Sequence, residues 1–260
     1  MLRHLLRIAV LVLAAGLACA FLVRYAPGTM VDERELDRRL SEESIRELRS
    51  NKASSERVFD TLWRFMKGDL GYSESNHAPI ASLIADRAPE TLRELAIGLA
   101  GGWFFGLALA LPKRGFSVLA GLLLSLPTAL IAYLCLREGA TSYLILVIVL
   151  TPRIFRFARN LLAQANTALH IEMARARGVT EIGILLKHVL PAISPQLLAL
   201  AAASVSLAIG AAIPIEAICD VPGLGKLAWN AAMARDLPLL VNLTMIVAVA
   251  TTAATAVSEI

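Results

Sequence analysis

The chain has 260 residues, of which 57% are hydrophobic and 18% are charged, and its formal net charge is +4. A soluble domain of this length does not need so much apolar surface for its core, so the composition excludes an ordinary globular protein and indicates a polytopic membrane protein. The basic residues are spread over segments that flank apolar runs, which argues against a nucleic-acid-binding protein. The three cysteines, at positions 19, 135 and 219, share no metal-ligand spacing and are interpreted as small core residues.

Six apolar runs have about the 20 residues needed to cross roughly 30 Å of hydrocarbon. They cover residues 8–25, 92–111, 116–136, 139–158, 189–214 and 238–257. Lys and Arg in short loops mark the cytoplasmic side of a membrane protein. Ten of them lie before the first run, after the second, and from Arg153 near the end of the fourth run to Lys187 before the fifth. Only four lie on the opposite side, at positions 24, 137, 226 and 235. Both termini are therefore predicted to be cytoplasmic.

The N-terminal run is either a retained span or a cleaved signal peptide that ends near Ala18-Cys19-Ala20. We favour the span, because the apolar residues continue to Val23. Residues 29–89 follow as a charged external segment whose few apolar residues recur at helical spacing. Within this segment, Gly68–Gly71 is predicted to form a turn and Pro79–Ile84 a short interfacial helix. Pro89 is then placed to start the second span, with Glu90 in its first turn.

The second and third spans are joined by a few residues only, so they are predicted to form an antiparallel hairpin. The second span contains four glycines that would allow a neighbouring helix to approach closely, at positions 98, 101, 102 and 106. Pro127 is predicted to kink the third span.

A polar stretch, Asn166–Pro195, interrupts the apolar C-terminal half. Thr167 can cap a short helix through His170–Arg177, and Gly178 stands where a residue in the left-handed conformation would end it. Thr180 can cap a second helix that leads into the fifth span, where Pro191 and Pro195 would bend it. The residues alone allow two interpretations, a basic loop that only fixes topology or a docking element for a soluble partner.

The fifth span is followed by a Pro222-Gly223 dipeptide, which predicts a tight turn before a short amphipathic helix on the outer side. The spans contain no Asp, Glu, Lys, Arg or His within 95–111, 115–136, 189–214 or 237–257, so they offer no proton relay. This argues against ion coupling, although backbone sites in broken helices could still bind sodium. The four histidines lie in loops or near the terminus without a partner nucleophile or metal-ligand spacing. The energy for any active transport would come from another chain.

Two motifs carry a resemblance to a known family. Glu172-Met173-Ala174, then Gly178, then His188-Val189-Leu190-Pro191, resembles the Glu-Ala-Ala, Gly, Ile-x-Leu-Pro loop of membrane subunits in bacterial binding-protein-dependent ABC importers. Met173 replaces an alanine of that pattern and His188 an isoleucine. The second motif runs from Glu216 through Pro222-Gly223-Leu224-Gly225 to Arg235-Asp236, and resembles the Glu, Pro-Gly-Leu-Gly, Arg-Asp-x-Pro signature of the family. The series from Gly68-Asp69-Leu70-Gly71 through Arg87 and Pro89 to Thr91-Leu92 resembles the dipeptide, oligopeptide and nickel permease branch.

The resemblance implies an all-α membrane protein with the type I ABC importer fold, six transmembrane helices and a short cytoplasmic coupling helix. Residues 1–260 would form one transmembrane domain, with an external segment at 29–89, a five-span core at 92–260 and a cytoplasmic coupling loop at 160–188. The residues implied in ATPase coupling are Glu172, Met173, Ala174, Arg175, Arg177, Gly178, Leu190 and Pro191. Those implied in an external loop or gate are Glu216, Pro222, Gly223, Leu224, Gly225, Arg235 and Asp236.

The same resemblance implies a non-catalytic permease subunit in the bacterial inner membrane that imports peptides, a related small solute or a nickel chelate. Its expected partners are membrane lipid, a homologous second permease subunit, two cytoplasmic ATPases that bind ATP and Mg, and an external substrate-binding protein. No cofactor or metal is expected in this chain. The alternative from another class is an ATP-independent secondary transporter or channel.

Overall fold

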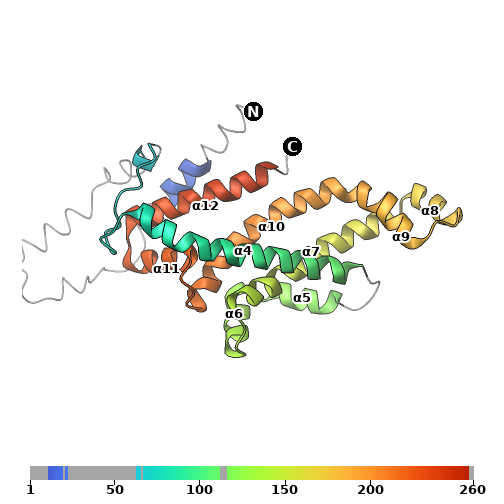
Figure 1. Ribbon diagram of the computed structural model, residues 1–260, viewed down its shortest axis with the longest axis horizontal. Helices are drawn as coiled ribbons and strands as arrows, with labels where there is room; N and C mark the ends of the chain where they lie inside the picture. The colour runs from blue at the N-terminus through green and yellow to red at the C-terminus, as the bar shows by residue number, and fades with distance from the viewer. Residues whose placement is uncertain (1–10, 20, 23–62, 66, 112–115, 258–260) are drawn as a thin grey trace, which may run out of the picture. The chain divides into compact units, whose positions relative to one another are not determined.

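The computed structural model describes residues 11–19, 21–22, 63–65, 67–111 and 116–257. Its elements in chain order are α4 (Ile80–Ala110), α5 (Ser117–Ser125), α6 (Thr128–Arg137), α7 (Ser142–Asn166), α8 (Leu169–Ala176), α9 (Glu181–Ile184), the π-helix η1 (Leu185–Val189), α10 (Leu190–Ile218), α11 (Leu224–Ala234) and α12 (Leu237–Val257) (Figure 1). Residues 11–19 and 21–22 are also helical, while the rest of the predicted first span and residues 29–62 lie outside the described residues. Within the described ranges the only β pairing is an isolated bridge between Tyr72 and Pro79, so this part of the chain is all-α.

Three of the described helical runs are long and apolar enough to cross a bilayer, namely Ile80–Ala110, Glu181–Ile218 and Leu237–Ala256. A fourth crossing requires α5 and α6 to be counted as one broken span. α7 has the length of a span, but Arg153 lies near its middle and Arg156 and Arg159 lie in its second half. The membrane-protein class is therefore confirmed, and the total of six spans stays a prediction.

The chain divides into two compact units. Unit 1 takes in residues 1–84 and 230–248, and its described part has a small core in which Val12 packs with Val241 and Met245 of α12. Unit 2 takes in residues 85–229 and 249–260, and its core lies between α6, α7 and α10.

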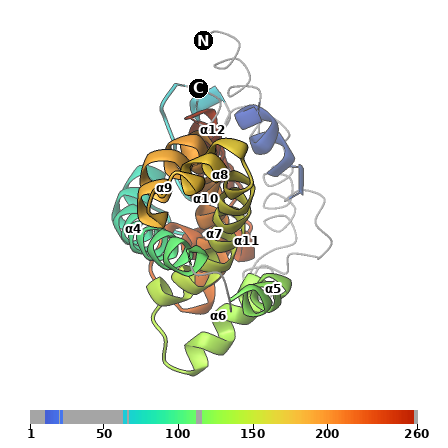
Figure 2. The same cartoon turned by 90° about the vertical axis from the view of Figure 1, so that its right-hand side faces the viewer.

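α7 is the central helix of unit 2, because α5, α6 and α10 all pack against it. α4 also lies on α7, as both cartoon views show (Figure 2). A Cβ atom at Gly98 would stand 2.4 Å from Leu146 Cδ2, one at Gly102 2.9 Å from Leu150 Cβ, and one at Gly106 2.8 Å from Ile154 Cγ2. These distances are shorter than any ordinary contact, so only glycine permits this approach. The predicted role of the glycine face is confirmed.

The start of the second span was predicted wrongly. α4 begins at Ile80 and runs without interruption through Pro89, so the predicted interfacial helix and the second span are one helix. Pro89 lacks a backbone N–H, so α4 loses one hydrogen bond to the residue four positions earlier. The helix nevertheless continues on both sides of Pro89. Glu90 lies inside the helix, where it accepts a hydrogen bond from the Tyr143 hydroxyl of α7.

The third span is broken more sharply than a kink. α5 and α6 meet at an angle of 105°. Both linking residues are extended, Leu126 with φ −87° and ψ 138° and Pro127 with φ −60° and ψ 139°. A proline disfavours helical geometry at the preceding residue and cannot donate a backbone hydrogen bond, so two successive residues leave the helix and redirect the chain.

The glycine face leads to a first prediction. Gly98→Ala should destabilise the protein by roughly 1–3 kcal/mol, because the added methyl group overlaps Leu146 in a packed interface. Gly210→Ala in α10 is the matched control: no atom lies within 4 Å of its Cβ position, so it should be neutral or stabilising by about 0.5–1 kcal/mol. Thermal unfolding of the purified chain in detergent measures both. Equal effects of the two substitutions would contradict close α4–α7 packing.

Candidate functional site

The short helix α8 follows α7 after a two-residue link. The predicted cap at Thr167 is wrong: Thr167 closes α7 in a helical conformation, and its hydroxyl donates to the Gln164 carbonyl at 2.8 Å. The N-cap of α8 is Ala168, which has no side-chain acceptor to offer. A hydroxyl that belongs to the end of one helix is not available to cap the next.

Gly178 ends α8 as predicted. Its φ is +79°, and the backbone N–H of Val179 donates to the Ala174 carbonyl at 3.2 Å. No atom lies within 4 Å of the Cβ position at Gly178, so the requirement for glycine comes from the backbone conformation. Thr180 then caps α9, since its hydroxyl accepts a hydrogen bond from Gly183 N at 3.2 Å.

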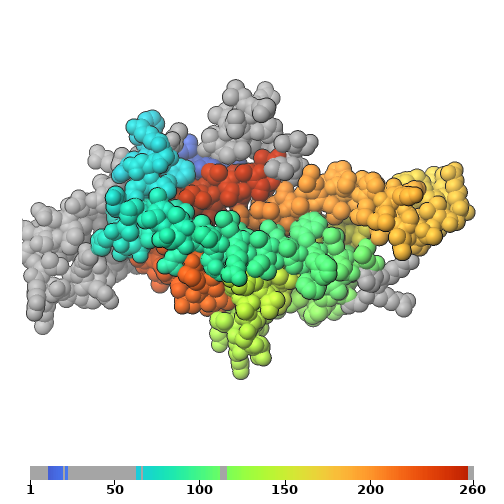
Figure 3. All heavy atoms as spheres, in the orientation of Figure 1, coloured from blue at the N-terminus to red at the C-terminus, as the bar shows by residue number. Residues whose placement is uncertain are grey.

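α8 has one buried face and one exposed face. Ile171 and Ala174 are buried in a cluster with Ile184, Val189 and Ile193, which joins α8 to α9, η1 and α10. Glu172 and Met173 point outward, and 53% of the Met173 surface is exposed. Figure 3 shows α8 and α9 in yellow and gold as a surface-exposed element at the end of α10. Among the predicted coupling residues, Ala174 is therefore buried and fixes α8 to the rest of the unit, whereas Glu172 and Met173 are exposed and available to a partner.

Arg175 in the last turn of α8 and Arg177 at its C-cap differ in their surroundings. Arg175 Nε and Nη2 donate to the two carboxylate oxygens of Glu181 at 2.7 and 3.2 Å, so this ion pair bridges the Gly178 turn. The hydrogen bond to Glu181 raises the pKa of Arg175. Both side chains are about half exposed or more, so solvent screens this ion pair and its contribution to stability is small. Arg177 is exposed at the C-cap.

Leu190 and Pro191 lie where the polar loop enters α10. The five residues of η1 precede them, and the backbone N–H of Leu190 donates to the Leu185 carbonyl, five residues earlier. Pro191 has no backbone N–H and cannot donate the next α-helical hydrogen bond, and a wider π-helical turn precedes it. Where the sequence predicted a bend, the hydrogen bonds change from the π-helical to the α-helical pattern.

Glu216 lies at the other end of α10 and is fully buried. Its carboxylate accepts hydrogen bonds from Thr91 Oγ1 at 2.6 Å, from Gly225 N at 2.6 Å and from Lys226 N at 3.3 Å. The Thr91 hydroxyl in turn accepts from Leu224 N at 2.8 Å. One carboxylate therefore joins α4, the end of α10 and the start of α11.

Gly223 and Gly225 make room for this carboxylate. A Cβ atom at Gly223 would lie 2.2 Å from Glu216 Oε2, and one at Gly225 would lie 2.6 Å from the Ile213 Cα atom. Neither glycine has a positive φ; the left-handed residue of this loop is Asp220, with φ +58°. The turn around the exposed Pro222 is closed by Gly223 N, which donates to the Val221 carbonyl at 2.8 Å. The predicted tight turn exists, but its glycine is required by the neighbouring side chain.

The sequence reasoning missed Thr91 and Glu94. Glu94 is fully buried on α4, and neither of its carboxylate oxygens has a hydrogen-bond partner among the described residues. It lies one position before the uncharged range 95–111. A signal was present, because Thr91, Glu94 and Gly98 are three and four residues apart and therefore share a helix face.

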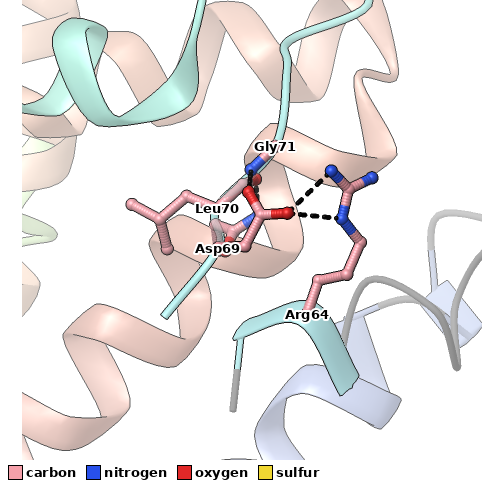
Figure 4. A network of polar contacts seen from close by, with 5 residues as sticks. Arg64, Asp69, Leu70 and Gly71 are labelled. Atoms are coloured by element: carbon pink, nitrogen blue, oxygen red, sulfur yellow. Dashed lines mark hydrogen bonds and ion pairs between the residues drawn. The ribbon is translucent and has the colours of Figure 1, made fainter. Parts of the chain in front are cut away.

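The predicted Gly68–Gly71 turn begins the segment that leads to α4. Asp69 Oδ2 accepts hydrogen bonds from Arg64 Nε at 3.0 Å and Nη2 at 2.8 Å, and Asp69 Oδ1 accepts from Gly71 N at 3.0 Å (Figure 4). The hydrogen bond from Arg64, followed by that from Gly71, lowers the pKa of Asp69. Gly68 and Gly71 have φ values of +80° and +73°.

Asp236 binds the residues just after this turn. Its Oδ2 accepts hydrogen bonds from Ser73 Oγ at 2.5 Å, Ser75 N at 2.9 Å and Ser75 Oγ at 2.8 Å, and its Oδ1 accepts from Leu239 N at 3.1 Å, which caps α12. Burial alone would raise the pKa of Asp236, but these hydrogen bonds outweigh it and the pKa lies below its ordinary value. Arg235 is half-buried with φ +52°. Asp236 thus joins the segment around Ser73 to the start of α12 in unit 1. Glu216 joins α4 to the start of α11 in unit 2.

These features define a class of protein: an all-α membrane subunit with an exposed helix–turn–helix anchored to a membrane-crossing helix. Residues 98–260 match the family described as binding-protein-dependent transport system inner membrane component. This is more than half of the chain, and the chain belongs to that family. It is therefore a multi-pass inner membrane protein with the type I ABC importer fold, a permease subunit of the peptide and nickel branch, and it works within an ABC transporter assembly.

Curated relatives agree with this assignment. The chain is 29% identical to a putative peptide permease protein of Brucella ovis, over 72% of this chain and 70% of the relative. It is 25% identical to the oligopeptide transport system permease protein OppB of Haemophilus influenzae, over 92% and 89%. It is 24% identical to the glutathione transport system permease protein GsiC of Salmonella paratyphi A, over 69% of each chain.

The geometry at Glu216 leads to a second prediction. Gly223→Ala should destabilise the protein by roughly 1–3 kcal/mol, because the Glu216 carboxylate is held by three donors and cannot move away from the new methyl group. Glu216→Ala also destabilises the protein, since it leaves buried donors unpaired. The double variant Glu216→Ala/Gly223→Ala should be no less stable than Glu216→Ala alone, because the clash is gone. Thermal unfolding and tryptic cleavage after Lys226 measure this, and additive losses would refute the contact.

The hydrogen bonds of Asp236 lead to a pH prediction. The lowered pKa means that an unfolded Asp, with a pKa near 3.9, binds a proton more readily than folded Asp236. The stabilisation is therefore complete above about pH 4 and is lost as the pH falls through the folded pKa. Thermal unfolding of the wild type and of Asp236→Asn between about pH 3 and pH 7 should show a stability difference that shrinks below about pH 4. A difference that stays constant over this range would contradict the assignment.

Proposed function

We propose that this chain forms one half of the translocation pathway of an ATP-driven importer for peptides or a related small solute, a nickel chelate included. The substrate class is supported by relatives named for oligopeptide and glutathione transport, and glutathione is itself a small peptide. We propose that α8 is the cytoplasmic coupling helix on which an ATPase docks.

The geometry of α8 carries this proposal. A helix that only fixed topology would have no need for a packed inner face, yet Ile171 and Ala174 anchor α8 to α9, η1 and α10. The outer face presents Glu172 beside large exposed apolar side chains, Leu169 and Met173 on α8 and Ile182 on α9. Exposed apolar groups with a polar rim are typical of a protein interface.

A displacement of α8 would reach the far side of the membrane through α10. α10 has 29 residues, so it spans roughly 40 Å at 1.5 Å per residue. The coupling loop joins it at Leu190, and Glu216 lies near its other end. Movement at α8 would thus be transmitted to the loop held by Glu216, without any charged relay within the bilayer.

The assembly that we propose contains this chain, a homologous second permease subunit, two cytoplasmic ATPases that bind ATP and Mg, and an external substrate-binding protein. The chain itself is non-catalytic and holds no cofactor or metal. Both termini and the coupling loop are cytoplasmic, and the Glu216 loop faces outward. The positive charge in the loop between α7 and α10 supports this orientation.

A pair of glycines tests the coupling role. Gly178 and Gly139 both have positive φ, +79° and +78°, and both have empty space around the Cβ position. Valine at either position costs at least about 1–2 kcal/mol of backbone strain. Gly178→Val, which redirects α9, should abolish ATP-dependent peptide uptake and copurification of the ATPase, whereas Gly139→Val in the α6–α7 loop should retain ATPase copurification.

Glu172→Lys provides an independent arm of the same experiment. It reverses an exposed charge without changing the fold, so membrane insertion should be normal while ATPase copurification and uptake fall. Full uptake by both Gly178→Val and Glu172→Lys would overturn the docking role and leave the loop with a purely topological function.

A further inference from the structure

Three polar side chains form a cluster where α4 meets the start of α7. The hydroxyl of Tyr143, in the first turn of α7, donates a hydrogen bond to Glu90 Oε1 on α4. The Cζ atom of Arg93, also on α4, lies 5.4 Å from the centroid of the Tyr143 ring, which is within the range of a cation–π contact. Tyr143 therefore contacts both a carboxylate and a guanidinium that lie about one turn apart on the same helix.

The two charged groups of this cluster are accessible. Arg93 is exposed and Glu90 is half-buried. In the part of the chain that the structure describes, no carboxylate forms an ion pair with Arg93, so the N–H donors of its guanidinium can still bind an anion. Glu94, the residue after Arg93, is fully buried and does not share this surface.

An exposed apolar stripe on α4 begins next to Arg93. Ile97, Ala100 and Phe104 follow Arg93 at intervals of four, three and four residues, so all of them lie on one helix face. The three apolar residues are exposed, Ile97 to 42% and Phe104 to 68%. From Arg93 to Phe104 the helix rises by about 16 Å, which is close to half of the roughly 30 Å of hydrocarbon in a bilayer. The stripe therefore has about the length of one lipid leaflet.

The order of these groups along α4 matches a phospholipid with an ethanolamine headgroup. Glu90 lies three residues before Arg93, so it is about 4.5 Å further from the apolar stripe along the helix axis. In such a lipid the acyl chains, the phosphate and a primary ammonium follow one another in the same order, and a short ethylene link separates the two charges. A guanidinium suits a phosphate, and a carboxylate accepts hydrogen bonds from an ammonium. Tyr143 lies beside both charges, and tyrosine is enriched at the level of lipid headgroups.

We propose that this face of α4 binds one molecule of phosphatidylethanolamine. Arg93 holds the phosphate, Glu90 accepts hydrogen bonds from the ammonium, and an acyl chain lies along Ile97, Ala100 and Phe104. A zwitterionic peptide could satisfy the two charges, but it has no acyl chain to cover the stripe. The lipid accounts for both the charged pair and the apolar face. This site is separate from the coupling loop, and it does not depend on the proposed transport function.

Native mass spectrometry of the purified full-length chain in detergent tests the lipid site. The chain is titrated separately with phosphatidylethanolamine, with phosphatidylcholine, whose quaternary ammonium has no N–H, and with phosphatidylglycerol, whose headgroup has no ammonium. Phosphatidylethanolamine should bind most tightly. Arg93→Ala should weaken its binding by about tenfold or more, as expected for the loss of hydrogen bonds to a charged group. Arg87→Ala is the matched control, because it removes a charge from the same helix outside the cluster, and it should leave binding unchanged.

Glu90→Gln separates the contact with the ammonium from the contact with the phosphate. The amide oxygen can still accept the hydrogen bond from Tyr143, so thermal unfolding of this variant should match the wild type. The amide carries no negative charge, so the preference for phosphatidylethanolamine over the other two lipids should disappear.

Three outcomes would overturn the proposal. Equal binding of the three lipids by the wild type, or equal losses in Arg87→Ala and Arg93→Ala, would show that the cluster does not select a headgroup. Displacement of the bound lipid by dialanine, a zwitterion without acyl chains, would assign the charged pair to a peptide. A changed oligomeric state of Arg93→Ala with unchanged lipid binding would assign this face of α4 to a second subunit.

Discussion

The buried Glu216 carboxylate is held by three hydrogen-bond donors, and this interaction organises one end of the fold. An ionised group away from water loses a large hydration energy unless neighbouring donors replace it. Here the donors come from α4 and from the backbone of α11, so the segments that supply them are held at fixed positions. The loop can approach the carboxylate only without side chains, which accounts for Gly223 and Gly225.

The same helix that ends at Glu216 begins at the coupling loop. α10 therefore joins two polar elements that lie at opposite ends of a long apolar segment. Its start is a π-helical turn beside a proline, and its first residues share a core with α8. A rigid helix with a polar assembly at each end can transmit a movement without ionisable groups in between, which fits a subunit driven by ATPases outside the membrane.

α4 and α7 form the packing that supports this arrangement. Within a membrane, apolar side chains gain little by leaving lipid, so close backbone approach and van der Waals contact hold helices together. The glycine face of α4 receives Leu146, Leu150 and Ile154 of α7. α7 in turn carries the core on which α6 and α10 lie.

The sequence by itself determined the class of protein, the glycine packing face, the left-handed stop at Gly178 and the cap at Thr180. These features depend on composition or on a few neighbouring residues, and local chemistry decides them. The cap at Thr167 was predicted wrongly because two helices could use the same residue, and it ends α7. The helix start at Pro89 was predicted wrongly because α4 continues through this proline. Pro127 was identified as a break, but its 105° angle depends on two extended residues in succession.

Only the tertiary structure decided what surrounds the carboxylates. Thr91 and Glu216 are 125 residues apart in the chain, and Ser73 and Asp236 are 163 apart. Nothing in the local sequence indicates that these groups meet. Gly223 looked like a turn glycine, yet its φ is ordinary and the Glu216 carboxylate is what excludes a side chain there. Long-range hydrogen bonds and steric exclusion are properties of packed elements, and a one-dimensional pattern does not contain them.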